Sequence, residues 1–290
     1  MSVSLITGKG GLPAVRVAND AATAEIMLLG AHLISYVPAH STELIWMSSA
    51  SQFKDGTPIR GGIPICWPWF AKHAQDPDNM PMHGFARHTS WGVTNVSEPD
   101  SRHTTVTLTL SDTPASRRLW PHPFRLDAIF TIADTLTVEL VTLNLDDQPV
   151  VISQGIHTYF QLKDIEAIRI HGFDNVTYFD KARGANDIKT MPAGPFAIRE
   201  EVDGVFKHAP GPFVVDDPEL NRTITVTTAG SDSAVIWNPW KERSAVLPDY
   251  TPDAYKTMVC VETCNALEDA RTIQPGQSHA IKATYTVAQR

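Results

Sequence analysis

The stretch RHTTVTLTLS, from Arg102 to Ser111, places an apolar or threonine side chain at every second position. Successive side chains of a β-strand point to opposite faces, so this alternation is typical of a strand with one buried face. The same period recurs in four further runs, Phe124 to Ala133, Thr135 to Leu145, Arg222 to Ala229 and His279 to Ala288. Turn-forming residues separate several of these runs, as in LDDQP and QPGQ.

Helical periodicity is nearly absent, and the single candidate is TPASRRLW, residues 113–120, where Pro114 suits a first helical turn. The sequence therefore predicts an all-β fold, a large antiparallel β-sandwich of two facing sheets with few short helices. At 290 residues, one large β domain competes with two small ones. The proline-rich stretch from Asp180 to Pro218 is the best candidate boundary, but strand patterns resume after it. We expect residues 1–290 to form a single domain.

Composition excludes several classes of protein. A content of 42% hydrophobic and 19% charged residues can supply a core, and a formal charge of −8 without a basic run argues against nucleic acid as a partner. The N-terminus lacks a signal-peptide pattern, and no run of about 18 apolar residues is present. We expect a soluble, cytoplasmic monomer that does not contact a membrane.

Three cysteines, Cys66, Cys260 and Cys264, form an odd and sparse set that fits a reducing compartment. The Cys260–Cys264 spacing has no matching Cys or His pair downstream at the spacing of a zinc site. We interpret all three as buried small hydrophobic residues and expect no metal site.

Two stretches are rich in glycine and aromatic residues: IRGGIPICWPWF at residues 59–70 and MHGFAR at residues 82–87. Their glycines, prolines and aromatic side chains can be read as stiff loops that fill space. Arg60 and Arg87 call for a different reading, because a guanidinium on a rigid loop can hold a phosphate or carboxylate with two hydrogen bonds. His83 lies four residues before Arg87 and could converge on the same ligand.

A histidine and a glutamate lie inside apolar runs. His157, in GIHTYFQL on an expected strand, is either a satisfied core histidine or a site residue. Glu262 lies in the hydrophobic strand KTMVCVETCNA, where an unpaired carboxylate is costly. Sites that perturb pKa values are where general bases are found. Only the tertiary fold could bring these two residues together.

Between them lie two further candidates. Asp180, in VTYFDK, is either a turn residue or a ligand contact. Trp237 and Trp240, in VIWNPW, either form the floor of a sugar site or fill core.

In their order along the chain, RGGIP-x-CWPWF, HGFAR, HTYF, YFDK, WNPW and CVE resemble the glucose-6-phosphate 1-epimerase (hexose-6-phosphate mutarotase) branch of the aldose 1-epimerase superfamily. The motifs span Arg60 to Glu262. HTYF is shared with galactose mutarotases, whereas RGGIP together with HGFAR is characteristic of the branch that acts on phosphorylated sugars. The large antiparallel sandwich of this family agrees with the period-two pattern.

The resemblance implies roles for individual residues. His157 would be the general acid and Glu262 the general base, Arg60 and Arg87 would bind the anionic end of the substrate, and Asp180 would contact a sugar hydroxyl. We add His83 as a candidate substrate contact. The implied activity is the interconversion of the α and β anomers of a hexose 6-phosphate by ring opening and closing, an isomerase reaction that needs no cofactor.

Two positions depart from the family pattern. Met82 stands where relatives often have glutamine, and His88 stands where they often have asparagine, which leaves the preferred hexose open. Three alternatives remain: a mutarotase of unphosphorylated aldoses, a glycoside hydrolase and a non-catalytic sugar-phosphate binder. A hydrolase usually needs two facing carboxylates, and only Glu262 is a clear candidate.

Overall fold

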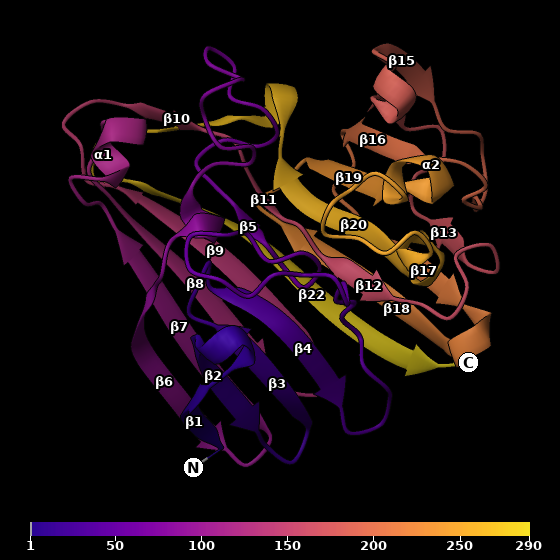
Figure 1. Ribbon diagram of the computed structural model, residues 1–290, viewed down its shortest axis with the longest axis horizontal. Coiled ribbons are helices and arrows are strands. Elements are labelled where there is room, and N and C mark those ends of the chain that lie inside the picture. The colour runs from indigo at the N-terminus through magenta and orange to yellow at the C-terminus, as the bar shows by residue number, and fades with distance from the viewer. Residues whose placement is uncertain (1) are drawn as a thin grey trace.

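The computed structural model describes residues 2–290 (Figure 1). It consists mainly of hydrogen-bonded antiparallel strands. Sheet I has eight strands. The five strands predicted from a period of two are all in it, next to one another, with ends within one residue of those predicted. Its strands, in spatial order, are β13 (Arg169–His171), β17 (Phe213–Asp217), β18 (Arg222–Ala229), β22 (Ser278–Gln289), β9 (Leu136–Asn144), β8 (Phe124–Ile132), β7 (His103–Ser111) and β6 (Gly92–Asp100).

Sheet II also has eight strands, and its central strand is β20. Its strands are β15 (Asp187–Thr190), β14 (Thr177–Asp180), β16 (Val202–Lys207), β19 (Ser233–Asn238), β20 (Met258–Asn265), β11 (Gln154–Ile156) and β5 (Ile65–Cys66), with β12 (Tyr159–Gln161) also paired to β20. All eight residues of β20 are buried, so this strand has no polar face and shows no period of two.

Sheet III contains β1 (Val3–Thr7), β2 (Pro13–Ala18), β3 (Ala22–Met27) and β4 (His32–Pro38), and a separate two-stranded ladder joins β10 (Val150–Ile152) to β21 (Arg271–Ile273). The α-helices are α1 (Ser116–Leu119), inside the predicted helical segment, and α2 (Trp240–Ser244). Six single 3₁₀ turns complete the described part: Lys9–Gly11, Ala86–His88, Ala182–Gly184, Pro218–Leu220, Ala254–Thr257 and Leu267–Asp269. The all-β prediction is confirmed, and none of the helices in residues 2–290 has the length and apolar character needed to span a bilayer.

One large core lies between sheet I and the layer formed by sheets II and III. Phe130 of β8, Val261 of β20 and Ile26 of β3 are fully buried in it. The ring of Phe160 on β12 meets the ring of Tyr285 on β22 edge to face, with centroids 5.6 Å apart. The proline-rich stretch that marked a candidate boundary contributes strands to both eight-stranded sheets.

The opposite face of sheet II carries a second set of side chains. Val259 and Val261 of β20 point into the main core, so Cys260, Glu262 and Cys264 point the other way. Residues 39–91 and the α2 region cover this outward face, as the purple loops and α2 in Figure 1 indicate, with Trp46 and Tyr250 packed near Cys260. All three cysteines are buried and unpaired, as predicted.

Glycines allow the covering segment to fold back on itself. Trp67 and Gly84 form a parallel β-bridge, and the Phe85 amide donates to the Trp67 carbonyl at 3.1 Å. Gly84 has a φ of 73°, and a Cβ added there would lie 1.9 Å from the Trp67 carbonyl oxygen. Only a residue without a side chain fits this position.

We expect Gly84→Ala to lower the free energy of unfolding by about 1–3 kcal/mol more than Gly56→Ala, measured by urea denaturation. Gly56 is the matched control, because its φ is 70° but an added Cβ would meet nothing within 4 Å. Both variants carry the cost of a left-handed alanine, about 1–2 kcal/mol, and only Gly84→Ala adds the collision. Equal losses would show that the close approach to Trp67 is unimportant.

Candidate active site

His157 and Glu262 face each other across neighbouring strands. In the pairing with β20, Ile156 lies opposite Thr263 and Tyr159 opposite Cys260, which puts His157 directly opposite Glu262. The His157 Nε2 atom is 3.3 Å from Glu262 Oε1. The fold therefore brings together two residues that are 105 positions apart in the sequence.

The strand predicted through GIHTYFQL is interrupted at His157 and Thr158, between β11 and β12. The His157 amide donates to the Pro64 carbonyl at 3.1 Å, and the Thr158 amide donates to the nearby Ile156 carbonyl at 3.2 Å. This local turn corrects the sequence prediction. It also ties the histidine to the glycine-rich loop that follows Arg60.

Burial controls the charges of the pair, since the Glu262 side chain is 1% exposed and the His157 side chain 10%. Desolvation raises the pKa of Glu262 well above its usual value, and nearby Asp203 adds to this while Lys181 opposes it. Desolvation lowers the pKa of His157 well below its usual value, and Arg60 and Arg87 lower it further. Burial therefore favours a neutral carboxyl beside a neutral imidazole.

Aromatic rings hold the imidazole in place. The Tyr159 ring stacks on the His157 ring at 4.8 Å with an interplanar angle of 7°, and the edge of Trp237 approaches His157 with centroids 6.3 Å apart. Trp240, by contrast, is buried against Tyr255. The two interpretations of VIWNPW thus divide between its tryptophans: Trp237 lines the site and Trp240 fills core.

Arg60 is held from three sides. Its Nε donates to Asp249 Oδ2 at 2.9 Å, its Nη1 donates to the Tyr159 hydroxyl at 3.0 Å, and its guanidinium lies over the Tyr250 ring at 5.3 Å. Its Nη2 makes no hydrogen bond to residues 2–290 and is available to a ligand. Tyr159 thus connects the guanidinium to the His157 ring.

The glycine pair after Arg60 is locked to the sheets. The Gly62 amide donates to Trp46 and its carbonyl accepts from the Tyr159 amide, at 2.8 and 3.0 Å. The carbonyl of Gly61 accepts from Nε2 of His32, on β4, at 2.7 Å. A Cβ on Gly62 would lie 2.3 Å from the same imidazole nitrogen, so glycine is required here.

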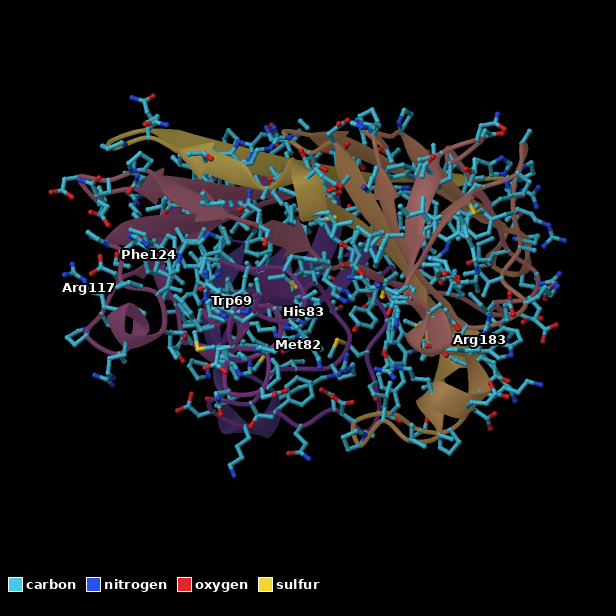
Figure 2. The ribbon with its side chains drawn as sticks, turned by 90° about the horizontal axis from the view of Figure 1, so that it is seen from above. Trp69, Met82, His83, Arg117, Phe124 and Arg183 are labelled. Carbon is cyan, nitrogen blue, oxygen red and sulfur yellow. The ribbon has the colours of Figure 1, made fainter. Side chains whose placement is uncertain are left out.

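Arg87 and His83 belong to the second glycine loop. Arg87 Nη2 donates to the Met82 carbonyl at 2.6 Å, and its Nε is buried without a partner among the described residues. The Ala71 amide donates to His83 Nδ1 at 3.1 Å, so neutral His83 carries its hydrogen on Nε2. Burial and then Arg87 lower the pKa of His83 well below its usual value. Figure 2 shows Met82 and His83 near the middle of the molecule, and the His83 ring lies 5.7 Å from that of His157.

Asp180 is engaged elsewhere. One of its carboxylate oxygens accepts from the Ala182 amide at 2.9 Å and the other pairs with Lys189 on β15. Hydrogen bonds to Lys189 and Ala182 hold the pKa of Asp180 below its usual value despite the opposing effect of burial. This local use of both oxygens matches the turn interpretation of Asp180.

Asp203 on β16 is a site residue that the sequence analysis did not identify. It lies opposite Trp237, which in turn lies opposite Cys260, so it shares the outward face of sheet II with Glu262. Burial raises the pKa of Asp203, and Lys181 opposes the rise. An acidic residue between apolar ones was the available signal, but the preceding Glu200 and Glu201 made the segment look exposed.

The arrangement contains a buried acid–base pair, with two arginines close enough to influence it electrostatically. Within residues 2–290, one group of side chains could also hold a metal ion, namely His157, Cys260 and Glu262. Such a pair can move protons to and from a polar substrate. The guanidinium groups can bind an anion.

Comparison with known proteins identifies the family of this chain. Residues 13–286 match the family described as Aldose 1-epimerase. An Escherichia coli K12 protein named "Putative glucose-6-phosphate 1-epimerase" is 33% identical over 267 residues, which cover 92% of this chain and 87% of the relative. A plant protein from Cenchrus ciliaris with the same name is 33% identical over 88% of this chain and 78% of its own length.

A solved structure shares the fold. The crystal structure of a "putative mutarotase" from Salmonella typhimurium superimposes with a TM-score of 0.92 at 31% identity, covering 100% of this chain and 94% of that one. The fold and the buried acid–base pair define a mutarotase-type β-sandwich. The chain belongs to the aldose 1-epimerase family, and this membership supports an epimerase activity on the anomeric carbon of a sugar.

His32, which holds the loop of Gly61 and Gly62, makes the free energy of unfolding of the protein depend on pH. Burial lowers the pKa of His32 to about 4, against 6.5 when unfolded, so only the unfolded chain gains this proton as the pH falls from 6.5. The resulting loss of stability is about 1.4 kcal/mol per pH unit between pH 6.5 and 4.

We expect His32→Gln, whose amide can still donate to Gly61, to remove this contribution. The stability advantage of the natural protein over the variant should shrink as the pH falls from 6.5 to 4, measured by urea denaturation at several pH values. An advantage that stays constant across this range would contradict a neutral buried His32.

Proposed function

We propose that this protein interconverts the α and β anomers of glucose 6-phosphate and related hexose 6-phosphates. The observation that carries the proposal is the buried His157–Glu262 pair at 3.3 Å, with Arg60 and Arg87 near enough to lower the pKa of His157. The names of the bacterial and plant relatives support the phosphorylated substrate. A glycoside hydrolase is less well supported: Asp203 is a second carboxyl group on the face of Glu262, but the residue directly opposite Glu262 is a histidine, and the family match is to aldose 1-epimerases.

The reaction requires one base and one acid. Transfer of the Glu262 proton to His157 gives the reactive ion pair. Ionised Glu262 then takes the proton of the C1 hydroxyl while protonated His157 gives a proton to the ring oxygen, and the bond between C1 and the ring oxygen breaks. Rotation about the C1–C2 bond turns the aldehyde, and the reverse transfers close the ring on its other face. General acid–base catalysis of this kind contributes about 10²–10⁴-fold per group.

Burial of the pair favours the protonation state that both residues have when the sugar ring is open. When the ring is open, Glu262 holds the hydroxyl proton and His157 has lost its own, so both residues are neutral. This is the form that desolvation favours. The environment therefore stabilises the protonation state that accompanies the ring-opened sugar, and no proton has to be exchanged with solvent.

Arg60 and Arg87 bind the 6-phosphate in this proposal, at the end of the sugar remote from C1. Binding energy gained there positions C1 against the acid–base pair. Asp249 and Tyr159 already fix the Arg60 guanidinium, so little side-chain entropy is lost when the phosphate binds. His83 offers its Nε2 hydrogen to a sugar oxygen, and Asp203 is a candidate partner for a sugar hydroxyl.

We expect His157→Ala and Glu262→Gln each to slow anomer exchange of glucose 6-phosphate by at least about 10²-fold, because each removes one of the two proton carriers. The measurement is NMR exchange spectroscopy of the anomeric protons. Glu268→Gln is the matched control for Glu262→Gln, since it makes the same change at an exposed position paired with Lys207. Undiminished exchange in a folded variant would refute the role of that residue.

We expect Arg87→Ala to reduce exchange of glucose 6-phosphate at least about tenfold more than exchange of free glucose, because only the ester uses the lost charge. Arg16→Ala, an exposed arginine on β2, is the control. Equal losses on both sugars would refute the phosphate role. Efficient exchange of free glucose by the natural protein, without any gain from phosphate, would favour a mutarotase of unphosphorylated aldoses.

A further inference from the structure

Cys260 lies beside the acid–base pair but has no part in the proposed reaction. It occupies β20 two residues before Glu262 and on the same outward face. One ligand atom from each of His157, Cys260 and Glu262 lies within 4.8 Å of the other two, and all three residues are buried. Two of these residues lie on β20, and the third lies in the turn between β11 and β12, which both pair with β20.

The chemistry of these side chains matches a particular ion. Imidazole, thiolate and carboxylate are the usual protein ligands of zinc, and three of them leave the fourth tetrahedral position open. Zinc–ligand bonds of about 2.0–2.3 Å place neighbouring ligand atoms about 3.3–3.8 Å apart. Side-chain rotations that move a ligand atom by about 1 Å would reduce a separation of 4.8 Å to this value.

A buried oxygen without a partner points to a ligand at this place. Glu262 Oε2 is buried and has no hydrogen-bond partner among residues 2–290. Buried polar atoms are normally satisfied, so this oxygen can gain from a ligand. The positive charges of Arg60, Arg87 and Lys181 oppose a cation, and the Asp203 carboxylate favours one.

We propose that His157, Cys260 and Glu262 form a zinc-binding site, and that Zn²⁺ bound there inhibits the enzyme reversibly. On binding, the Cys260 thiol and the Glu262 carboxyl release their protons to solvent. The ion then occupies lone pairs of His157 and Glu262, so these two residues can no longer exchange protons with the substrate. The binding is independent of the proposed function, whereas the inhibition rests on it.

Cobalt and zinc titrations of the metal-stripped, fully reduced protein test the site. We expect one equivalent of Co²⁺ to produce the near-ultraviolet charge-transfer absorption of a thiolate ligand, and Zn²⁺ to displace it. Cys260→Ala should abolish this absorption and weaken Zn²⁺ binding at least tenfold in calorimetry. Cys264→Ala is the matched control, two residues beyond Glu262 on the same face, and should leave both signals unchanged.

Activity measurements test the inhibition separately. Zn²⁺ should suppress anomer exchange in the natural protein and in Cys264→Ala, and a chelator should restore it. The concentration needed for half inhibition should rise at least tenfold in Cys260→Ala, relative to that variant's own metal-free rate. If Cys260→Ala does not fold, Cys260→Ser replaces it, because serine has nearly the same volume.

Three results would overturn the inference: no thiolate signal with Co²⁺, binding that survives the loss of Cys260, or binding without inhibition of an active enzyme. Failure of the proposed function looks different. Metal-free protein would then show no anomer exchange, while the cobalt spectrum would still report the His157–Cys260–Glu262 site.

Discussion

The site depends on the burial of one carboxyl group, Glu262, at the centre of sheet II. An isolated charge at this depth is costly. The side chain that contacts the Glu262 carboxyl is the imidazole of His157, not that of a lysine or an arginine. Desolvation favours the neutral form of both groups. The pairing of β20 with β11 and β12 on either side of His157 sets the distance between the two residues, and the Pro64 carbonyl holds the His157 amide.

In the proposed reaction, the groups that recognise the charge of the substrate are placed differently from those that carry its protons. Arg60 and Arg87 lie on glycine-rich segments outside the central strands, and these segments are joined to the sheets by backbone hydrogen bonds and bridges. Loops that are placed by a rigid scaffold commonly carry binding residues. In the proposed reaction the loops hold the two arginines for the anionic end of the substrate, while pairing with β20 keeps His157 opposite Glu262.

The quality of prediction differs between the two large sheets for a physical reason. Strands of sheet I such as β8 alternate buried with more exposed residues, so period two is visible in the sequence and their ends were predicted within one residue. Strands β19 and β20 of sheet II are covered on both faces and read as mostly apolar runs. The strand expected in KTMVCVETCNA is confirmed as β20, but in such runs period alone does not distinguish a strand from a buried helix. Asp203 was missed in this sheet, where alternation carries no signal.

By itself, the sequence determined the all-β class, the five strands of sheet I, the free buried cysteines and the candidates His157, Glu262, Arg60 and Arg87. These follow from local periodicity and from residue types that are costly or unusual in their surroundings. Only the tertiary structure decided that His157 stands opposite Glu262, that Asp180 is engaged with Lys189, and that Cys260 lies beside the pair. Such relations depend on which strands pair and in which register, and register is a property of contacts between segments far apart in the chain.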